Sequence, residues 1–262
     1  MRKKIIINKK KKKPIFSVIT VVKNDEENIL QTIKSIEKQS YKNFEYILID
    51  GSSTDNTLAK ILKNKKIVTK LISEKDKGIY DAMNKGIKLA KGEVIIFVNS
   101  GDILTKNALD IINKVFSKNK NLDFVFGTVK RHYTKAVIKK FGFNKNRLYY
   151  NFDFATAHST GFFLKRKIFK KYGVFNTNFK HSADYDLYYR LIIKYNLLGG
   201  STNKRNLIGI VSKGGYSSKV SFIDHLVEET RIRVHNKQNY LLVYLIFFNA
   251  LFKHILKKLK LI

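Results

Sequence analysis

Four runs of apolar and β-branched residues alternate with stretches of helical periodicity over the first hundred residues, and this alternation constrains the fold more than any other feature. The runs predict buried strands at residues 16–22, 44–49, 68–73 and 93–98. The stretches between them predict helices, one starting near Asn24 or Asp25 as its cap and others over 54–62 and 79–90. Such alternation is typical of an α/β fold with a mostly parallel sheet and right-handed crossovers.

Polar and acidic residues collect where each predicted strand ends. They lie at residues 20–26, 50–55, 73–78 and 99–102. In open α/β sheets, ligands bind beyond the carboxyl ends of the strands. The sequence therefore predicts a functional site along this edge of the sheet.

The charge of the chain is extreme, since 52 Lys and Arg against 20 Asp and Glu give a formal net charge of +32. Such a field attracts nucleic acid, anionic lipid or phosphorylated substrates. The excess is mostly lysine spread along the whole length, so a compositional bias without any binding role explains it equally well. The absence of cysteine excludes disulfides and thiolate metal sites.

Acidic residues at three places could carry chemistry at the predicted site. Asp50 could accept hydrogen bonds from a base or a ribose hydroxyl, and Asp102 could be an oxygen ligand of Mg²⁺ or Mn²⁺. Asp184 or Asp186 could act as a general base. In a helix, residues two apart point about 200° from each other, so only one of these two can face the site. Each position also fits an ordinary turn or helix cap.

Several familiar site types have no signature here. The first strand is followed neither by Gly-x-Gly-x-x-Gly nor by a Walker-type loop, which argues against a nucleotidyltransferase. Gly-x-Ser-x-Gly is absent, and His158, His181 and His225 lack zinc-ligand spacing. These histidines are interpreted as structural.

Taken together, five segments resemble the family 2 glycosyltransferases over roughly residues 15–190. They are residues 17–24 with Ser35 and Gln39, residues 50–57, residues 73–86, residues 92–93 with the turn 99–102, and residues 183–187 with Arg190. Each segment is common by itself, whereas their order and spacing are specific.

The resemblance implies a GT-A fold, in which a mostly parallel, Rossmann-like central sheet is flanked by helices. It also implies an inverting transfer of a sugar from a nucleotide-sugar, with a UDP-sugar as the expected donor, to an acceptor hydroxyl. The reaction would be a single in-line displacement that depends on Mn²⁺ or Mg²⁺.

Site residues follow from the same resemblance, residue by residue. Asp184 would be the general base and Asp102 would hold the metal. The nucleotide-sugar would be bound by Thr20, Asn24, Asp50, Ser52, Asp76, Lys77 and Asn84.

Two positions depart from the family pattern. The family's Asp-x-Asp is reduced to Ser100-Gly101-Asp102, which leaves one carboxylate for a metal, and Ala183 stands where a glutamate usually precedes Asp184. Two alternatives therefore stay open beside the transferase. One is a catalytically silent nucleotide-sugar-binding module, and the other is a basic nucleic-acid-binding protein. The latter leaves the acidic strand ends unexplained, so no nucleic-acid partner is expected.

We expect one large domain with short flanking segments. Residues 1–13 form a basic arm, residues 14–236 the glycosyltransferase domain, and residues 237–262 an amphipathic tail. Within the domain, residues up to about 125 form the nucleotide-sugar half and residues 126–236 the acceptor half. The acceptor half predicts hairpin strands within 125–143, a strand at 158–164, and helices over 184–194 and 222–236.

The tail is apolar and then basic, as expected for a helix lying on an anionic membrane surface. A helix packed on the domain or joining two copies is the alternative. No segment reaches the length of a spanning helix, because the run 240–252 is short and interrupted by Asn249. Because residues 1–13 lack the apolar region and cleavage site of a signal peptide, we expect a cytoplasmic protein that can lie on the inner face of the membrane. Its acceptor would be a saccharide or a lipid-linked saccharide of bacterial cell-surface polysaccharide or lipo-oligosaccharide synthesis.

Overall fold

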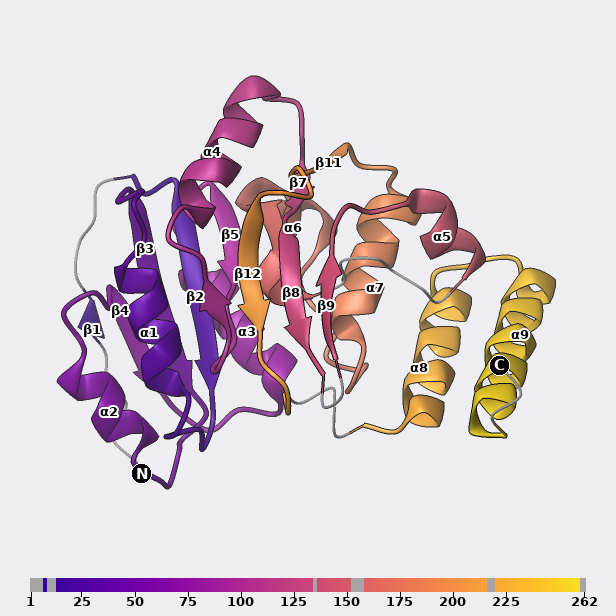
Figure 1. Ribbon diagram of the computed structural model, residues 1–262, viewed down its shortest axis with the longest axis horizontal. Coiled ribbons are helices and arrows are strands. Elements are labelled where there is room, and N and C mark those ends of the chain that lie inside the picture. The colour runs from indigo at the N-terminus through magenta and orange to yellow at the C-terminus, as the bar shows by residue number, and fades with distance from the viewer. Residues whose placement is uncertain (1–6, 9–12, 134–135, 152–157, 216–219, 260–262) are drawn as a thin grey trace.

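The computed structural model describes residues 7–8, 13–133, 136–151, 158–215 and 220–259. Its centre is an eight-stranded sheet, of which four neighbouring strands are parallel (Figure 1). In order, the strands are β1 (Ile7–Asn8), β4 (Lys70–Ser73), β3 (Phe44–Asp50), β2 (Phe16–Val22), β5 (Val94–Phe97), β10 (Phe162–Lys165), β7 (Phe124–Phe126) and β11 (Gly199–Ser201). The four strands predicted from the first hundred residues are thereby confirmed.

A smaller sheet lies beside the last strands of the large one. It consists of β6 (Ile103–Leu104), β12 (Leu207–Val211), β8 (Thr128–His132) and β9 (Val137–Lys140). Strands β8 and β9 form the predicted hairpin, and β12 pairs in parallel with β8 so that Val211 lies opposite Arg131.

Helices cover both faces of the large sheet, as the continuous apolar character of its strands requires. One face packs against α1 (Ile29–Glu37), α2 (Thr57–Lys63) and α4 (Ala108–Lys118). The other packs against α3 (Ile79–Leu89), α6 (Arg166–Tyr172) and α7 (Ala183–Tyr189), which continues as a π-helical turn, η2 (Arg190–Lys194). Every residue of β2 and β3 is buried between the two layers.

The start of α1 differs from the prediction. The helix begins at Ile29, and its N-cap is Asn28 rather than Asn24 or Asp25. Asp25 instead uses its backbone carbonyl to accept from Asn28 and Ile29, while its carboxylate accepts from the Asn28 side chain. A turn therefore precedes the helix, and Asn24 lies before this turn, close to the carboxyl end of β2.

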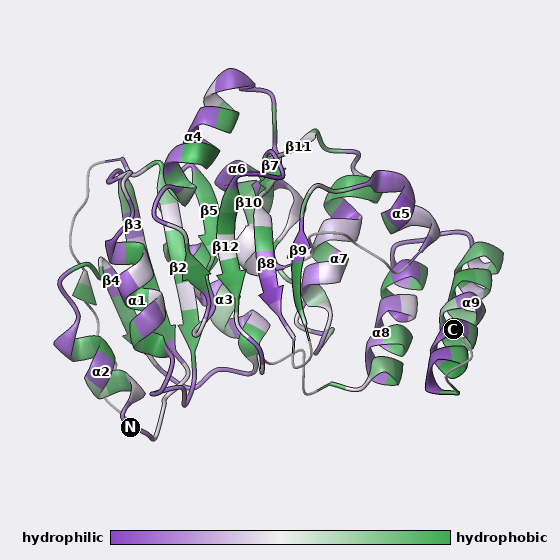
Figure 2. Ribbon diagram, viewed as in Figure 1, coloured by the Kyte–Doolittle hydropathy of each residue, from purple (hydrophilic) through white to green (hydrophobic). Residues whose placement is uncertain are grey.

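Three helices complete the second half of the chain: α5 (Lys145–Tyr150), α8 (Phe222–His235) and α9 (Tyr240–Lys258). Helix α9 packs on α8 at one end of the molecule through Val243 and Ile246, and Figure 2 shows apolar residues along the remainder of α9. Within the described residues, α9 is the one helix long and apolar enough to cross a membrane by length and composition. The expectation that no segment reaches this length is therefore wrong, because the apolar character continues past Asn249 to Leu256.

Candidate functional site

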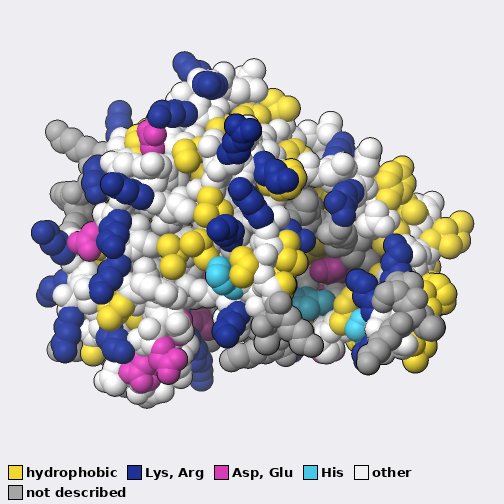
Figure 3. Space-filling view, viewed as in Figure 1, with side chains coloured by type: hydrophobic (Ala, Val, Ile, Leu, Met, Phe, Trp, Pro, Cys, Tyr) yellow, Lys and Arg dark blue, Asp and Glu magenta, His cyan; other side chains and the backbone are white. Residues whose placement is uncertain are grey.

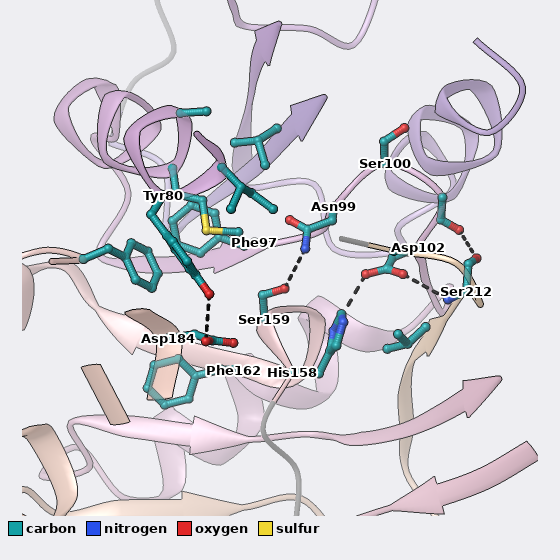
Figure 4. Close-up of a pocket in the computed structure, with 18 of the residues that line it drawn as sticks. Tyr80, Phe97, Asn99, Ser100, Asp102, His158, Ser159, Phe162, Asp184 and Ser212 are labelled. Carbon is teal, nitrogen blue, oxygen red and sulfur yellow. Dashed lines mark hydrogen bonds and ion pairs between the residues drawn. The ribbon is translucent and has the colours of Figure 1, made fainter. Parts of the chain in front are cut away.

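A cavity of about 1070 Å³ opens at the predicted edge of the sheet. Its walls include the segments that follow β2, β4 and β5, the start of α7, the ends of β8 and β12, and one side of α8 (Figure 4). Segments that are far apart in the sequence therefore meet at the carboxyl ends of the parallel strands, as the strand order requires.

Asp184 lies in the first turn of α7 and lines this cavity. Its Oδ1 atom accepts hydrogen bonds from the Tyr80 hydroxyl of α3, at 2.9 Å, and from the backbone N–H of Tyr185, at 3.0 Å. Burial raises the pKa of the Tyr80 hydroxyl well above its usual range, and the Asp184 carboxylate adds to the shift. Tyr80 therefore stays a donor, which fixes Oδ1 and leaves Oδ2 for another partner.

Asp186 points away from the cavity, as the helical geometry predicts. It is fully buried, with Oδ2 2.8 Å from Arg190 Nε and Oδ1 3.0 Å from Asn236 Nδ2. Of the two aspartates, one is available to a ligand and the other ties α7 to η2 and α8.

Glu228 of α8 holds the segment that leads into α7. Its two carboxylate oxygens accept from the backbone N–H groups of Lys180, His181 and Ser182 at 2.6–2.7 Å. These donors would otherwise be left without a partner at a helix start. The position of Asp184 therefore depends on a residue 44 positions further along the chain.

Glu229, the next residue, lines the cavity instead. Burial and the nearby Asp184 raise its pKa to about 8. At pH 7 the carboxyl group is thus neutral in the folded protein and ionised in the unfolded chain, so its burial costs stability above pH 4.5 and most strongly above pH 8.

Substituting the two neighbouring glutamates should have opposite effects. Glu228→Gln removes the charge and replaces one accepting oxygen by an NH₂ group that cannot accept, so one or two of the three hydrogen bonds are lost. It should lower the free energy of unfolding by about 2 kcal/mol, measured by urea denaturation at pH 7. Glu229→Gln is its matched control and should leave stability unchanged or raise it, because it removes an ionisation that folding disfavours. Equal effects of the two variants would contradict these assignments.

Asp102 lies at the opposite wall, just before β6. It is 4% exposed; Oδ2 accepts from the Thr160 hydroxyl at 2.5 Å, and Oδ1 accepts from the Ser212 N–H at 3.0 Å. Burial raises its pKa to about 7, against the opposing effects of these hydrogen bonds and of Arg131. Both carboxylate oxygens thus already have protein donors.

His158 lies beside Asp102, with Nδ1 3.8 Å from Oδ2. Burial and the charge of Arg131 lower the pKa of His158 to about 4, so the imidazole is neutral. Its Nδ1 accepts from the backbone N–H of Thr160, which leaves the proton on Nε2.

Two oxygens in the turn after β5 have no hydrogen-bond partner among the described residues, although they are buried. They are Asn99 Oδ1 and Ser100 Oγ. Asn99 is oriented by its Nδ2 group, which donates to Ser159 Oγ at 3.0 Å. Both residues line the cavity, so these oxygens are suited to a polar ligand.

Asn24 and Asp76, which the resemblance assigns to nucleotide-sugar binding, also line the cavity. Asn24 adopts φ of +50°, and its Oδ1 accepts from the Thr54 N–H at 2.8 Å. Asp76 Oδ1 accepts from the Gly78 N–H, and a Cβ atom on Gly51 would lie 2.3 Å from Asp76 Oδ2. A side chain at position 51 would therefore displace the Asp76 carboxylate from its present position.

Thr20 and Asp50, which the resemblance also assigns to nucleotide-sugar binding, do not line the cavity. Thr20 is buried in β2, where its hydroxyl donates to the Val98 carbonyl. Asp50 is fully buried and accepts from the Ser53 N–H and from the hydroxyls of Ser53 and Ser73. Its carboxylate is used to join the turns that follow β3 and β4.

Three further predicted residues also lie outside the cavity lining. Ser52 occupies a turn with φ of +57°. Lys77 is exposed, and only its backbone N–H is engaged, by Asp81. Asn84 uses both halves of its side-chain amide on the backbone of Phe175, at 2.9 and 3.1 Å, which fixes the segment after α6.

Several lining residues were missed from the sequence. Tyr80 lies inside the segment 73–86 that resembles the family, and its hydroxyl, three residues after Lys77, could have marked it as a site residue. Arg131, His158, His225 and Glu229 lie in the second half of the chain, where no motif marked them.

This fold and cavity define a class: an α/β protein that presents a ligand site at the carboxyl ends of parallel strands, with one carboxylate held ready by a neighbouring hydroxyl. The model of the family described as glycosyl transferase family 2 matches residues 17–173, and the chain belongs to this family. It is a glycosyltransferase with the predicted GT-A fold.

Curated relatives extend this result. A PGL/p-HBAD biosynthesis glycosyltransferase of Mycobacterium tuberculosis is 28% identical over 213 residues, which cover 72% of this chain and 80% of that protein. An Escherichia coli protein, UDP-Glc:alpha-D-GlcNAc-diphosphoundecaprenol beta-1,3-glucosyltransferase WfgD, is 34% identical over 128 residues, or 48% of this chain and 50% of that protein.

Solved structures agree on the fold. S. aureus TarS 1-349 in complex with UDP superposes with a TM-score of 0.67 at 19% identity, covering 91% of this chain and 71% of that one. The mannosyltransferase PcManGT from Pyrobaculum calidifontis, in complex with GDP-Man and Mn²⁺, gives a TM-score of 0.65 at 17% identity, covering 91% and 69%.

Proposed function

We propose that this glycosyltransferase transfers a sugar from a UDP-sugar to the hydroxyl of a saccharide or lipid-linked saccharide, with inversion, in the synthesis of a bacterial surface polysaccharide or lipo-oligosaccharide. The observation that carries the proposal is Asp184, which faces the cavity with one oxygen fixed by Tyr80 and the other available. The names of the relatives, with a UDP-glucose donor and a lipid-linked acceptor in one of them, support the substrate class.

The proposed reaction is a single displacement. Asp184 Oδ2 takes the proton of the acceptor hydroxyl while the acceptor oxygen attacks the anomeric carbon. The bond from that carbon to the diphosphate breaks on the opposite face, which inverts the configuration. Tyr80 keeps Asp184 in place throughout, and the neutral Glu229 can donate a hydrogen bond to the acceptor.

The donor nucleotide would bind along the strand ends. Asn24 and Asp76 lie at the base side, and the unpartnered oxygens of Asn99 and Ser100 suit the ribose hydroxyls. In this proposal Asp50 acts indirectly, because it fixes the turns that carry Ser53 and Ser73. Residues 14–125 would thus form the donor half and residues 126–236 the acceptor half.

The predicted Mn²⁺ or Mg²⁺ requires a suitable set of ligands. Asp102 is nearly buried, and both of its oxygens accept hydrogen bonds from the protein. Among the described residues there is no group of three His, Asp or Glu side chains that could hold a metal. Hard cations in such sites are held by one or two carboxylates together with the phosphates. The turn after β5 thus offers a cation a single carboxylate that already accepts two protein hydrogen bonds, so the residues present fit a metal poorly, and the mechanism above is written without one.

A thermal-shift panel of UDP-, GDP-, CMP- and dTDP-sugars, with and without Mn²⁺, tests the donor. A UDP-sugar at 100 times its dissociation constant should stabilise the fold by about 2.7 kcal/mol, which raises Tm by roughly 5–10 °C. The other nucleotide sugars serve as controls. Binding without turnover toward any saccharide acceptor would favour the catalytically silent module, and no shift with any donor would contradict the proposal.

We propose further that α9 attaches the enzyme to an anionic membrane surface. Leu241, Leu245, Phe248 and Phe252 recur on one side of the helix and are each 59–71% exposed, whereas Lys253, Lys257 and Lys258 provide positive charge. Such a helix suits a bilayer interface, and the net charge of +32 disfavours a second copy of the chain as its partner.

Replacing the exposed apolar residues of α9 tests the attachment. The triple variant Leu245→Gln, Phe248→Gln, Phe252→Gln should lower binding to anionic vesicles by more than about tenfold, because each side chain loses its transfer into the interface. Its Tm should stay unchanged. The matched control replaces Val137, Tyr150 and Leu198, which are 50–56% exposed elsewhere, by Gln. Undiminished sedimentation of the α9 variant with vesicles would remove this helix from the role.

A further inference from the structure

The turn that carries Asp102 presents little negative charge to a cation. Ser100 and Gly101 supply no carboxylate, and Asp102 is held by Thr160 and Ser212. Asp102 thereby anchors the end of β12 against the turn after β5, and the Ser212 hydroxyl donates to the Gly101 carbonyl of that same turn. Asp102 therefore has a structural task, and as a single carboxylate that accepts two hydrogen bonds it leaves this turn with few ligands for a cation.

Cationic side chains line the same part of the cavity. Arg131 is the last residue but one of β8, Lys213 follows β12, Lys140 lies on β9 and Lys23 follows β2. Because β8 and β12 run in parallel with Arg131 opposite Val211, Arg131 and Lys213 reach the same edge, beside the Ser212–Asp102 hydrogen bond. Figure 3 shows Lys and Arg side chains over this small sheet, with few acidic ones near them.

We propose that Arg131 and Lys213 bind the diphosphate of the donor and neutralise the charge of the leaving group in place of a divalent cation. This inference rests on the proposed function. As the bond between the anomeric carbon and the diphosphate oxygen breaks, the electron pair stays on that oxygen, and the acceptor proton passes to Asp184. The diphosphate gains one negative charge, and a guanidinium can meet it with two parallel N–H donors.

Arg131 is placed for this task by its neighbours. Its guanidinium lies 5.1 Å from the centroid of the Tyr133 ring, which supports the planar group from one side. The positive charge of Arg131 acts to lower the pKa of both Asp102 and His158. The guanidinium therefore lies near these two residues, at the end of the cavity beside the turn after β5. Lys213 is exposed and also lines the cavity, as does Gly214, whose φ of +86° bends the backbone after it.

Calorimetric titration of the full chain with UDP and UMP, in EDTA and in MnCl₂, tests the proposal. The wild-type protein should bind UDP in EDTA with an affinity within about twofold of that in MnCl₂, and more tightly than UMP. Arg131→Gln and Lys213→Gln should each lower the UDP affinity by about tenfold and the UMP affinity much less, because the second phosphate loses a charge partner. Arg131→Lys should recover part of the loss. Lys118→Gln, an exposed lysine of α4 away from the cavity, is the control.

The outcomes separate this proposal from the proposed function. UDP binding that appears only with Mn²⁺ would overturn the cationic site and leave the glycosyltransferase proposal intact. Wild-type UDP affinity in a folded Arg131→Gln variant would overturn it as well. No binding of UDP or of GDP by the wild-type protein, with or without the metal, would overturn both.

Discussion

Asp184→Asn should lower kcat for sugar transfer by about 10³-fold, within the range that a positioned general base contributes. The reason is local: the amide cannot accept the acceptor proton, whereas its oxygen can still accept from the Tyr80 hydroxyl and the Tyr185 N–H. The fold should therefore be unchanged. Steady-state kinetics with the donor identified by thermal shift would measure the loss, and the donor affinity should stay within about twofold of the wild-type value.

Two controls make this result specific. Asp110→Asn changes a half-buried aspartate of α4, away from the cavity, whose i,i+4 pair with Lys114 is worth only about 0.3–0.5 kcal/mol, and it should keep full activity. Tyr80→Phe should reduce kcat by a smaller factor, about tenfold, because Asp184 keeps its charge and loses one orienting hydrogen bond. Turnover by Asp184→Asn at the wild-type rate would remove Asp184 from the role of base.

The first hundred residues were predictable because local patterns and tertiary structure agree there. The strands are short continuous apolar runs, and each ends in polar residues that the parallel topology brings to one edge. Knowing the order of strands and helices was therefore enough to place Asn24, Asp76 and Asp102 at a common cavity.

The direction of a side chain is what the sequence pattern leaves open. Thr20 and Asp50 lie near the carboxyl ends of their strands, but their side chains face the protein interior. There the Thr20 hydroxyl donates to the Val98 carbonyl and the Asp50 carboxylate accepts from the Ser73 hydroxyl. Asn84 lies in a helix near the site, and its amide is fully used by the Phe175 backbone. No spacing in the sequence distinguishes a polar group that binds a ligand from one that supports the loop beside it.

The second half of the site was hidden for a different reason. Glu228 and Glu229 are adjacent on α8, yet one holds the backbone before α7 and the other lines the cavity. Their roles follow from the packing of α8 on α7, which brings residues about 45 positions apart together. That packing depends on burial rather than on a motif, and the buried Arg233 of α8, which donates to the carbonyls of Leu148 and Tyr149, is part of it.

The second large effect is expected on the stability of the fold, and it concerns Asp186, two residues after Asp184. Asp186 is fully buried and pairs with Arg190, whose side chain is 12% exposed. Asp186→Ala leaves the guanidinium without its carboxylate and removes one of the two acceptors of Asn236 Nδ2, which keeps the Ile232 carbonyl. Breaking such a buried pair costs about 3–5 kcal/mol, which lowers Tm by roughly 6–20 °C in a chain of this size.

Calorimetry or circular dichroism would measure this fall, and Asp110→Ala is the matched surface control. Arg190 also donates to the carbonyls of Tyr172 and Val174, so the damage should spread to the segment after α6 and with it to Asn84 and Tyr80. At temperatures where the variant is still folded, donor binding should persist, since Asp186 does not line the cavity. A Tm change below about 2 °C would mean that the pair is no more than a surface ion pair in energetic terms. Two residues, about half a helical turn, would then separate the proposed base from a dispensable aspartate, rather than from the residue that anchors its helix.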